Sequence, residues 1–301
     1  MMAETLIGID VGGTKIEGTL VDRFGHVLDT YKVPARSGNA CVVEDVVTVA
    51  RHLSDEALPV GIGIPGRVDT AHGMVWDVVN LGILELPLAE EVSSQLGSDV
   101  RVVNDVNAAA LGASAALASG DVGNDALEVM AFLNLGTGLA AGVTRYGKLD
   151  HGFSGALGEI GHIPVDPNQL PCPCGQRGCL ETVGSGKGLR ELWPQANPAM
   201  PDIIARCEQG DEHAQEVLAK VMHAIGDALQ IITQTYDPHI IVIGGGISKT
   251  GEPLLQAISK EMTRRASSSH FIETIDIPSR LRLAPSGVPI GAIGAAMSLL
   301  S

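Results

Sequence analysis

The sequence predicts an α/β protein made of two lobes around a central cleft. The chain has 301 residues, more than one hydrophobic core usually serves, because single cores stop growing at roughly 250–300 residues. Short runs rich in Val and Ile alternate with helical patterns, as in α/β folds. A strand, a glycine turn and a second strand occur in "TLIGIDVGGTKIEGTLVD" and again in "MAFLNLGTGLAAGVTRYGKL". This repeat indicates two related lobes that each begin with a hairpin.

The first lobe is predicted to open with three strands and a helix. "ETLIGID" and "IEGTLVD" flank the turn "VGGTK" and form a β-hairpin with Asp10 at its tip. A third strand follows at 26–35, and apolar residues at helical spacing predict a helix at 41–57. "VGIGIPG" is a buried strand that Pro65 and Gly66 end.

The segment "VRVVNDVNAAALGASAAL" passes directly from a β-branched strand into an alanine-rich helix. Asn104 and Asp105 therefore stand at the carboxyl end of a strand, where open α/β sheets bind ligands. Further on, a long amphipathic helix at 213–236 leads into the buried strand "IIVIGGGIS". A last helix, rich in small residues, is predicted at 287–301.

These elements divide between the lobes. We assign residues 1–115 to the small lobe, completed by the C-terminal helix 287–301, and residues 116–286 to the large lobe. The boundary is expected near residues 110–125.

The charge and composition exclude some partners. Hydrophobic residues make up 45% of the chain, charged residues 18%, and the formal net charge is −15, which disfavours nucleic acid and anionic membranes. The N-terminal residues do not show the basic segment followed by an apolar one that is typical of a signal peptide. The apolar runs are shorter than the ~20 residues that span a bilayer. We expect a cytoplasmic protein with neither partner, whose cysteines stay reduced.

The glycine turns are candidate phosphate sites, because glycine lets backbone N–H groups approach phosphate oxygens. The first turn adds a hydroxyl, an ammonium and a carboxylate that can hold Mg²⁺ through water. The alternative is that the turns only close tight hairpins, or, for the last, join a strand to a helix. The candidate residues are Asp10, Gly12, Gly13, Thr14 and Lys15; Gly136, Thr137 and Gly138; and Gly244, Gly245 and Gly246.

Asp105 is the candidate general base. It follows a buried strand and precedes a helix, so it can face the cleft while Asn104 beside it hydrogen-bonds a substrate hydroxyl. The alternative is that Asp105 is the N-cap of the helix.

Four residues form a candidate metal site: His162, Cys172, Cys174 and Cys179. One imidazole and three thiolates suit tetrahedral Zn²⁺, and four protein ligands leave no open position, so the zinc is expected to be structural. Cys172 and Cys174 are separated by one residue, which is poor geometry for a disulfide between them. A redox-active pair of cysteines is the alternative.

Two glutamates flank these ligands. Glu159 precedes His162 by three residues, and Glu181 follows Cys179 by two. A closed zinc loop would fix both carboxylates near one place, where they can accept hydrogen bonds from vicinal sugar hydroxyls. Alternatively, both are solvated surface residues.

The order of these motifs resembles the ROK family, named for repressors, open reading frames and kinases. The resemblance rests on "IGIDVGGTKIEGTLVD", "GIGIPG", "VVNDVNAAALG", "LNLGTGLAAGV", "GALGEIGH", "CPCGQRGCLE" and "IIVIGGGIS" and covers nearly the whole chain. It implies a two-lobed actin-like ATPase (ribonuclease H-like) fold. It also implies transfer of the γ-phosphoryl group of ATP to a hexose hydroxyl, usually on C6.

The same resemblance implies roles for single residues. Asp105 matches the catalytic base, the three glycine segments match the phosphate loops and the nucleoside site, and His162 would meet sugar with one ring edge and zinc with the other. Sugar ligands would be Pro65, Gly66, Asn80, Asn104, Asp105, Glu159, His162 and Glu181. ATP, Mg²⁺ and structural Zn²⁺ are the implied cofactors, and a homodimer or homotetramer the implied assembly.

One position departs from the pattern. Many family members carry a tryptophan after "NLG" or "NLPG", where this chain has Ile83 in "NLGILELPL". We expect this difference to alter the sugar-side wall and the choice of substrate.

Other functions remain open within the family. Glucose is the first candidate substrate, ahead of N-acetylmannosamine, N-acetylglucosamine, fructose and allose; a sugar sensor without turnover is the alternative. Repressors carry a helix-turn-helix before the first hairpin, and here the hairpin starts almost at residue 5, which leaves no room for one. A chaperone or filament ATPase of this fold needs neither "EIGH" nor the cysteine loop.

Overall fold

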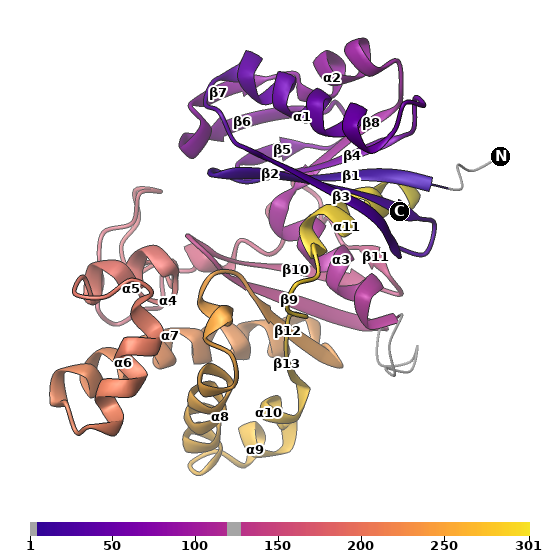
Figure 1. Cartoon of the computed structure of the whole chain (residues 1–301). Coiled ribbons are helices and arrows are strands. Elements are labelled where there is room, and N and C mark those ends of the chain that lie inside the picture. The colour runs from indigo at the N-terminus through magenta and orange to yellow at the C-terminus, as the bar shows by residue number, and fades with distance from the viewer. Residues whose placement is uncertain (1–4, 119–127) are drawn as a thin grey trace. The chain divides into compact units, whose positions relative to one another are not determined.

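A computed structural model describes residues 5–118 and 128–301 (Figure 1). The chain forms two compact units: unit 1 comprises Met1–Leu127, Gly142–Gly155 and Gly287–Ser301, and unit 2 comprises Glu128–Ala141 and Ala156–Ser286. Residues 142–155, which we assigned to the large lobe, thus belong to unit 1, because the chain returns to it within a strand. The lobe boundary expected near 110–125 lies partly outside the described residues.

Unit 1 is a mixed α/β unit, as the sequence predicts. Its elements are β1 (Thr5–Val11), β2 (Lys15–Asp22), β3 (Val27–Pro34), α1 (Asn39–Leu53), β4 (Val60–Ile64), β5 (Arg67–Asp69), β6 (Met74–Val78), η1 (Val79–Leu81), β7 (Ile83–Leu86), α2 (Leu88–Leu96), β8 (Val100–Asn104), α3 (Asp105–Ala118), β11 (Lys148–Leu149), α11 (Ile290–Met297) and η5 (Ser298–Leu300).

The main sheet of unit 1 has the order β3-β2-β1-β4-β8. β1 and β2 form the predicted antiparallel hairpin, and β4 lies parallel to both β1 and β8. Every residue of β4 is buried, as expected for a parallel strand with both faces covered. The register places Asp10 opposite Glu17, and Glu17 opposite Lys32. Three acidic or basic side chains therefore follow one another across one face of the sheet.

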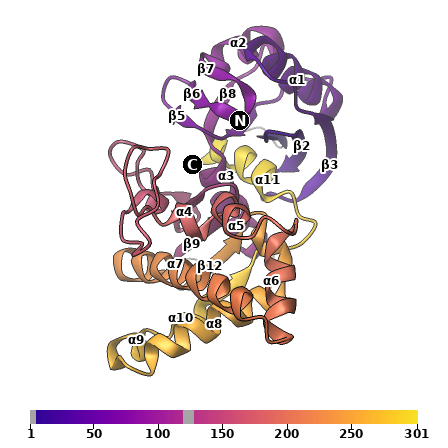
Figure 2. The same cartoon turned by 90° about the vertical axis from the view of Figure 1, so that its left-hand side faces the viewer.

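The C-terminal helix α11 packs against α3 and β1 within unit 1 (Figures 1 and 2). Glycine permits the close approach, since a Cβ atom on Gly294 would overlap the carbonyl of Ala108, and one on Gly112 would overlap that of Ile290. The small residues of "GVPIGAIGAAMSLL" are therefore required by the helix crossing.

The second five-stranded sheet repeats the strand order of the first. It runs β11-β10-β9-β12-β13; β9, β12 and β13 belong to unit 2, whereas β11 and the end of β10 belong to unit 1. β12 lies parallel to β9 and β13. The elements that complete the chain are β9 (Val129–Leu135), β10 (Leu139–Arg145, which ends in unit 1), η3 (Ile160–His162), α4 (Glu181–Gly184), α5 (Gly186–Leu192), α6 (Ala199–Glu208), α7 (Glu212–Tyr236), β12 (Ile240–Gly244), η4 (Ile247–Thr250), α8 (Glu252–Ala266), α9 (His270–Ile275), α10 (Ile277–Arg280) and β13 (Leu281–Leu283).

Two helices differ from the prediction at their ends. α1 ends at Leu53, four residues before the predicted end, because Ser54 takes an extended backbone (φ −158°) while its N–H still bonds the carbonyl of Ala50. α11 starts only at Ile290, because Pro289 has a non-helical backbone (φ −78°, ψ 63°), and ends at Met297, where the 3-10 helix η5 follows. Among residues 5–118 and 128–301, no helix has the length and apolarity needed to cross a membrane.

Candidate active site and metal centre

The start of α3 is fixed by Asn104. The N–H groups of Val106 and Asn107 donate to Asn104 Oδ1 at 2.9 and 3.4 Å, so Asn104 is the side-chain cap of the helix. Its Nδ2 donates to the carbonyl of Gly66 at 3.3 Å. Asp105, for which a capping role was the alternative, is instead the first residue of the helix. Asn104 is largely occupied by the protein, so we expect it to position Asp105 as well as to meet substrate.

Asp10 is the second candidate site residue of unit 1 with a carboxylate, after Asp105. Burial, followed by the charges of Asp105 and Glu17, raises its pKa from 3.8 to about 7, against a smaller opposing effect of Lys15. Asp10 also lies beside the first turn of α11, where a Cβ on Gly291 would come within 2.7 Å of its carboxylate. Two acidic groups in one electrostatic neighbourhood favour the retention of a proton by one of them.

A hydrogen bond within its own backbone closes the first glycine turn. The N–H of Gly12 donates to the carbonyl of Lys15 at 3.0 Å, so this donor closes the turn. Gly13, Thr14 and Lys15 are exposed. Asn80 lies beside Gly13, where an added Cβ would be 3.1 Å from the Cβ of Asn80. The structure thus brings one predicted sugar ligand against the predicted phosphate turn.

The ammonium of Lys15 is held by Glu17. Glu17 is only 8% exposed, and its two carboxylate oxygens lie 2.6 Å from Lys15 Nζ and 2.7 Å from Lys32 Nζ. The pKa of Glu17 is lowered because both lysines donate to it and attract it, which outweighs its burial. Glu17 and Lys32 were not found from the sequence; the signal available was their cross-strand register.

The turn after β4 carries Pro65 and Gly66, which are partly exposed, with Gly66 at φ +94°. The side chain of Ile83 is 1% exposed and lies in the core of unit 1; that its difference from tryptophan alters substrate choice stays a prediction. Val79 and Leu84 are the exposed apolar side chains of this segment, at 87% and 82%. Buried and exposed residues alternate along 81–84, so a one-residue step decides which side chain faces solvent.

In unit 2, two of the predicted nucleotide segments lie side by side. Gly245 (φ +85°) is so close to the second glycine turn that a Cβ on it would be 2.6 Å from the N–H nitrogen of Gly136. The carbonyl of Gly136 accepts from Gly186 at 2.7 Å, at the start of α5. The segment "GSGKG" at 184–188 therefore contacts the second glycine turn. Sequence reasoning did not connect these segments, because the contact depends on tertiary packing.

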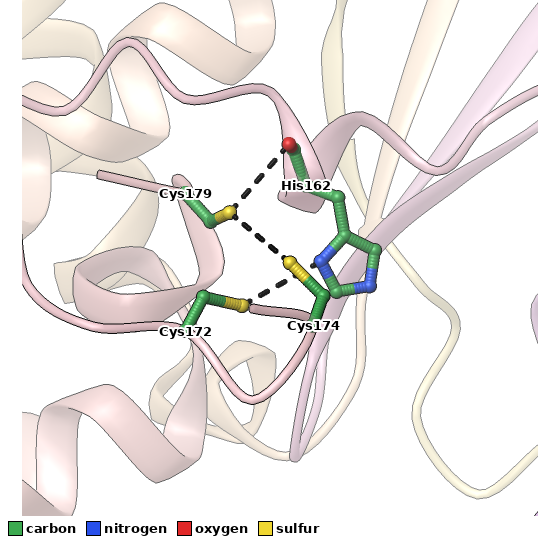
Figure 3. Close-up of side chains that lie close together, drawn as sticks. All are labelled: His162, Cys172, Cys174 and Cys179. Carbon is green, nitrogen blue, oxygen red and sulfur yellow. Dashed lines mark hydrogen bonds between the residues drawn. The ribbon is translucent and has the colours of Figure 1, made fainter. Parts of the chain in front are cut away.

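The four predicted metal ligands converge (Figure 3). One ligand atom from each of His162, Cys172, Cys174 and Cys179 lies within 4.8 Å of all the others. Cys174 Sγ and Cys179 Sγ are 3.7 Å apart, and so are Cys172 Sγ and His162 Nδ1. In a zinc tetrahedron with Zn–S near 2.3 Å, two sulfurs are separated by about 3.8 Å. The donor set and its spacing fit Zn²⁺, and all five cysteines of the chain are free.

The thiols differ in acidity. Hydrogen bonds from the backbone and side chain of Gln176 lower the pKa of Cys174 to about 6. Burial raises the pKa of Cys172 and of Cys179. Bound Zn²⁺ would favour the thiolate form of all three, since a coordinating thiol is deprotonated.

Glu181 joins the metal cluster to the second glycine turn. Its Oε1 accepts from the Cys172 thiol at 3.1 Å and lies 3.5 Å from His162 Nδ1. Its Oε2 faces Gly138. Glu159 directly precedes η3 and is exposed. The predicted sugar ligands of unit 2 are therefore held on the Cys₃His loop or next to it.

Two sheets of one strand order, each led by a hairpin with a glycine turn, are the architecture of the actin-like fold class. The sequence model of the ROK family matches residues 6–300. The chain belongs to the ROK family, and the resemblance inferred from the motifs is confirmed.

Relatives match along the whole chain. The glucokinase of Halalkalibacterium halodurans is 29% identical over 96% of this chain and 92% of its own length. The N-acetyl-D-glucosamine kinase of Citrobacter koseri is 34% identical over 96% of this chain and 97% of its own. The crystal structure of a ROK family glucokinase from Streptomyces griseus in complex with glucose and AMPPNP is 29% identical, with a TM-score of 0.75 over 97% of this chain and 98% of that one. The predicted actin-like ATPase fold is thereby confirmed.

Zinc content is the first prediction. Protein purified without added metal should contain about one zinc per chain, and Cys174→Ser should lower the zinc content, because one of four ligands is weakened. Elemental analysis measures both. Cys41→Ala, outside the cluster, should keep its zinc. Protein that folds and acts fully without metal would contradict the assignment.

The pH dependence of stability is the second prediction. Because the folded-state pKa of Asp10 is about 7, above its ordinary 3.8, its stabilising contribution is complete below about pH 4 and is lost as the pH rises through about 7. Asp10→Asn should therefore lose less free energy of unfolding between pH 5 and pH 8 than the unmodified protein, measured by urea unfolding. Asp29→Asn, at an exposed carboxylate on β3, is the control; equal losses in all three proteins would refute the assignment.

Proposed function

We propose that the chain is an ATP-dependent hexose kinase, with glucose as the first candidate substrate and glucose 6-phosphate as its product. The observation that carries the proposal is the position of Asp105. It begins α3 at the end of β8, fixed by the Asn104 cap and close enough to Asp10 to influence its pKa. A carboxylate in such a position suits general-base catalysis.

In the proposed step, the sugar hydroxyl oxygen attacks the γ-phosphorus of ATP in line. The new O–P bond forms as the bond to the β,γ-bridging oxygen breaks, ADP leaves, and the hydroxyl proton passes to Asp105. If the transition state is loose, positioning and charge neutralisation do most of the catalysis. Asp105 then serves mainly to orient the hydroxyl and to receive its proton.

The sugar is proposed to bind through a set of polar groups. Glu181 and His162 are held together on the metal loop, and carboxylates suit vicinal hydroxyls because each oxygen can accept a hydrogen bond. Glu159, Asn104 and Asn80 complete the polar set, with Pro65 and Gly66 supplying backbone. Zinc would hold the loop in shape, bound by His162 and the three cysteines, and would take no part in the phosphoryl step.

ATP is proposed to bind at the glycine turns. Gly13 and Thr14 are exposed, and Lys15 is held in place by Glu17. In unit 2, Gly245 lies against Gly136, and Gly136–Gly138 and Gly244–Gly246 are proposed to bind the nucleotide together. Asp10 offers the carboxylate oxygens that Mg²⁺ prefers, so Mg²⁺ is proposed to accompany the nucleotide.

N-acetylhexosamines are the second candidate substrates. A relative named N-acetyl-D-glucosamine kinase is 34% identical, against 29% for one named glucokinase. The exposed Val79 and Leu84, next to Asn80, are apolar groups of the kind that can contact an acetyl methyl. A cytoplasmic homodimer or homotetramer acting in carbohydrate metabolism is the setting that the family suggests.

A substrate panel tests this proposal. ADP release with ATP and Mg²⁺ should be fastest with glucose when compared with mannose, fructose, allose, N-acetylglucosamine and N-acetylmannosamine. Faster turnover of an N-acetylhexosamine would select the second candidate. Sugar binding without ADP release from any of them would point instead to a sensor and overturn the kinase proposal.

Loss of the base is a sharper test. Asp105→Asn should lower kcat by roughly 10²–10⁴-fold, with little change in the sugar dissociation constant, because only the proton acceptor is lost. Asp99→Asn, at the exposed opposite end of β8, should keep normal kcat. Near-normal turnover by Asp105→Asn would remove Asp105 from the role.

A further inference from the structure

The side chain of Gln176 contacts three groups of the metal cluster. Its Nε2 donates to the carbonyl of His162 at 3.1 Å, and lies 3.5 Å from Cys174 Sγ and 3.8 Å from Cys179 Sγ. The motif "CPCGQRGC" therefore contains a fourth polar group that faces the cluster besides its three thiols. No ligand role is available to it, since an amide nitrogen is a donor.

The backbone places this amide. The carbonyl of Gln176 accepts from the N–H of Cys172 at 2.9 Å, while Gly175, at φ +93°, turns the chain between Cys174 and Gln176. Gln176 is thus tied to one ligand through its main chain and to three others through its side chain. One hydrogen of the –NH₂ group can serve the His162 carbonyl while the other serves the sulfurs.

The negative charge of the site strengthens the hydrogen bonds that Gln176 donates. Zn²⁺ bound by three thiolates and a neutral imidazole carries a net charge of −1, and the site lies in a chain of formal charge −15. Glu181 adds a carboxylate 3.1 Å from Cys172 Sγ. N–H groups aimed at the sulfurs offset this negative charge, and hydrogen bonds to charged groups are stronger than those between neutral ones.

We propose that Gln176 is a positioning residue of the zinc centre, whose amide stabilises the thiolates of Cys174 and Cys179 and anchors the main chain of His162. This rests on the structural zinc of the proposed function. Its consequence reaches the sugar, because His162 is both a metal ligand and a proposed sugar ligand. Mutation of residues that hydrogen-bond to metal ligands typically lowers metal affinity by about 10–100-fold.

Two matched pairs of variants test the proposal. Gln169 lies in the same exposed loop and donates its Nε2 to the carbonyl of Asp166 at 2.9 Å, in a contact with no sulfur. Gln176→Asn and Gln169→Asn make the same shortening, and Gln176→Glu and Gln169→Glu add the same charge. Zinc affinity, measured by competition with a chromogenic chelator, should fall about 10–100-fold in the Gln176 variants, most in Gln176→Glu, and hardly at all in the Gln169 variants.

Cobalt provides a readout that folding alone does not move. In the Co²⁺-substituted protein, the thiolate-to-metal charge-transfer bands should shift in Gln176→Asn and stay unchanged in Gln169→Asn, because hydrogen bonds to sulfur alter its donor strength. Equal zinc affinity and equal spectra across each pair would overturn the role of Gln176 while leaving the kinase proposal intact. An unmodified protein that binds no zinc would overturn the zinc assignment and the role of Gln176 together.

Discussion

The cap that Asn104 makes on α3 is the interaction on which the chemistry of unit 1 depends. A buried parallel strand ends at this residue, and the helix begins with the next one. The Asn104 side chain accepts the N–H groups of Val106 and Asn107, and Asp105 Oδ1 accepts the same Val106 N–H at 3.0 Å. The Asn104 amide therefore ends the strand and starts the helix, while Asp105 is oriented by the first turn.

In unit 2, the candidate site residues are positioned by a different interaction. Its sugar-binding candidates lie in a segment of short turns between β11 and α5, where regular hydrogen bonding fixes little. Zn²⁺ held by the four ligand atoms, which lie within 4.8 Å of one another, would supply the missing constraint, since metal binding orders the loop that carries the ligands. His162 and Glu181 would then be held through the cysteines.

The sequence predicted the fold class, both hairpins and the ligand set, because these depend on local patterns: alternation, glycine turns and the spacing of cysteines. It could not assign the oxygen of Asn104 to the cap, because Asn and Asp cap helices about equally well. It also could not show that Ile83 is buried and Leu84 exposed, since only the packing of β7 decides which of two neighbouring apolar residues is buried. The contacts of Gly136 with Gly186 and Gly245 join segments about 50 and 110 residues apart, beyond any local pattern.

The neighbouring carboxyl groups of Glu17 and Asp10 in unit 1 differ in how readily they ionise. Glu17 is buried and ionised because two lysines flank it, whereas Asp10, opposite it in the sheet, has an acid near it and a pKa of about 7. Two lysines sharing one carboxylate leave one positive charge over, which suits phosphate. A divalent cation arriving with that phosphate would displace the proton of Asp10, because nearby positive charge favours the ionised carboxylate. Nucleotide binding and proton release would then be coupled at pH values below about 7, where Asp10 otherwise keeps its proton.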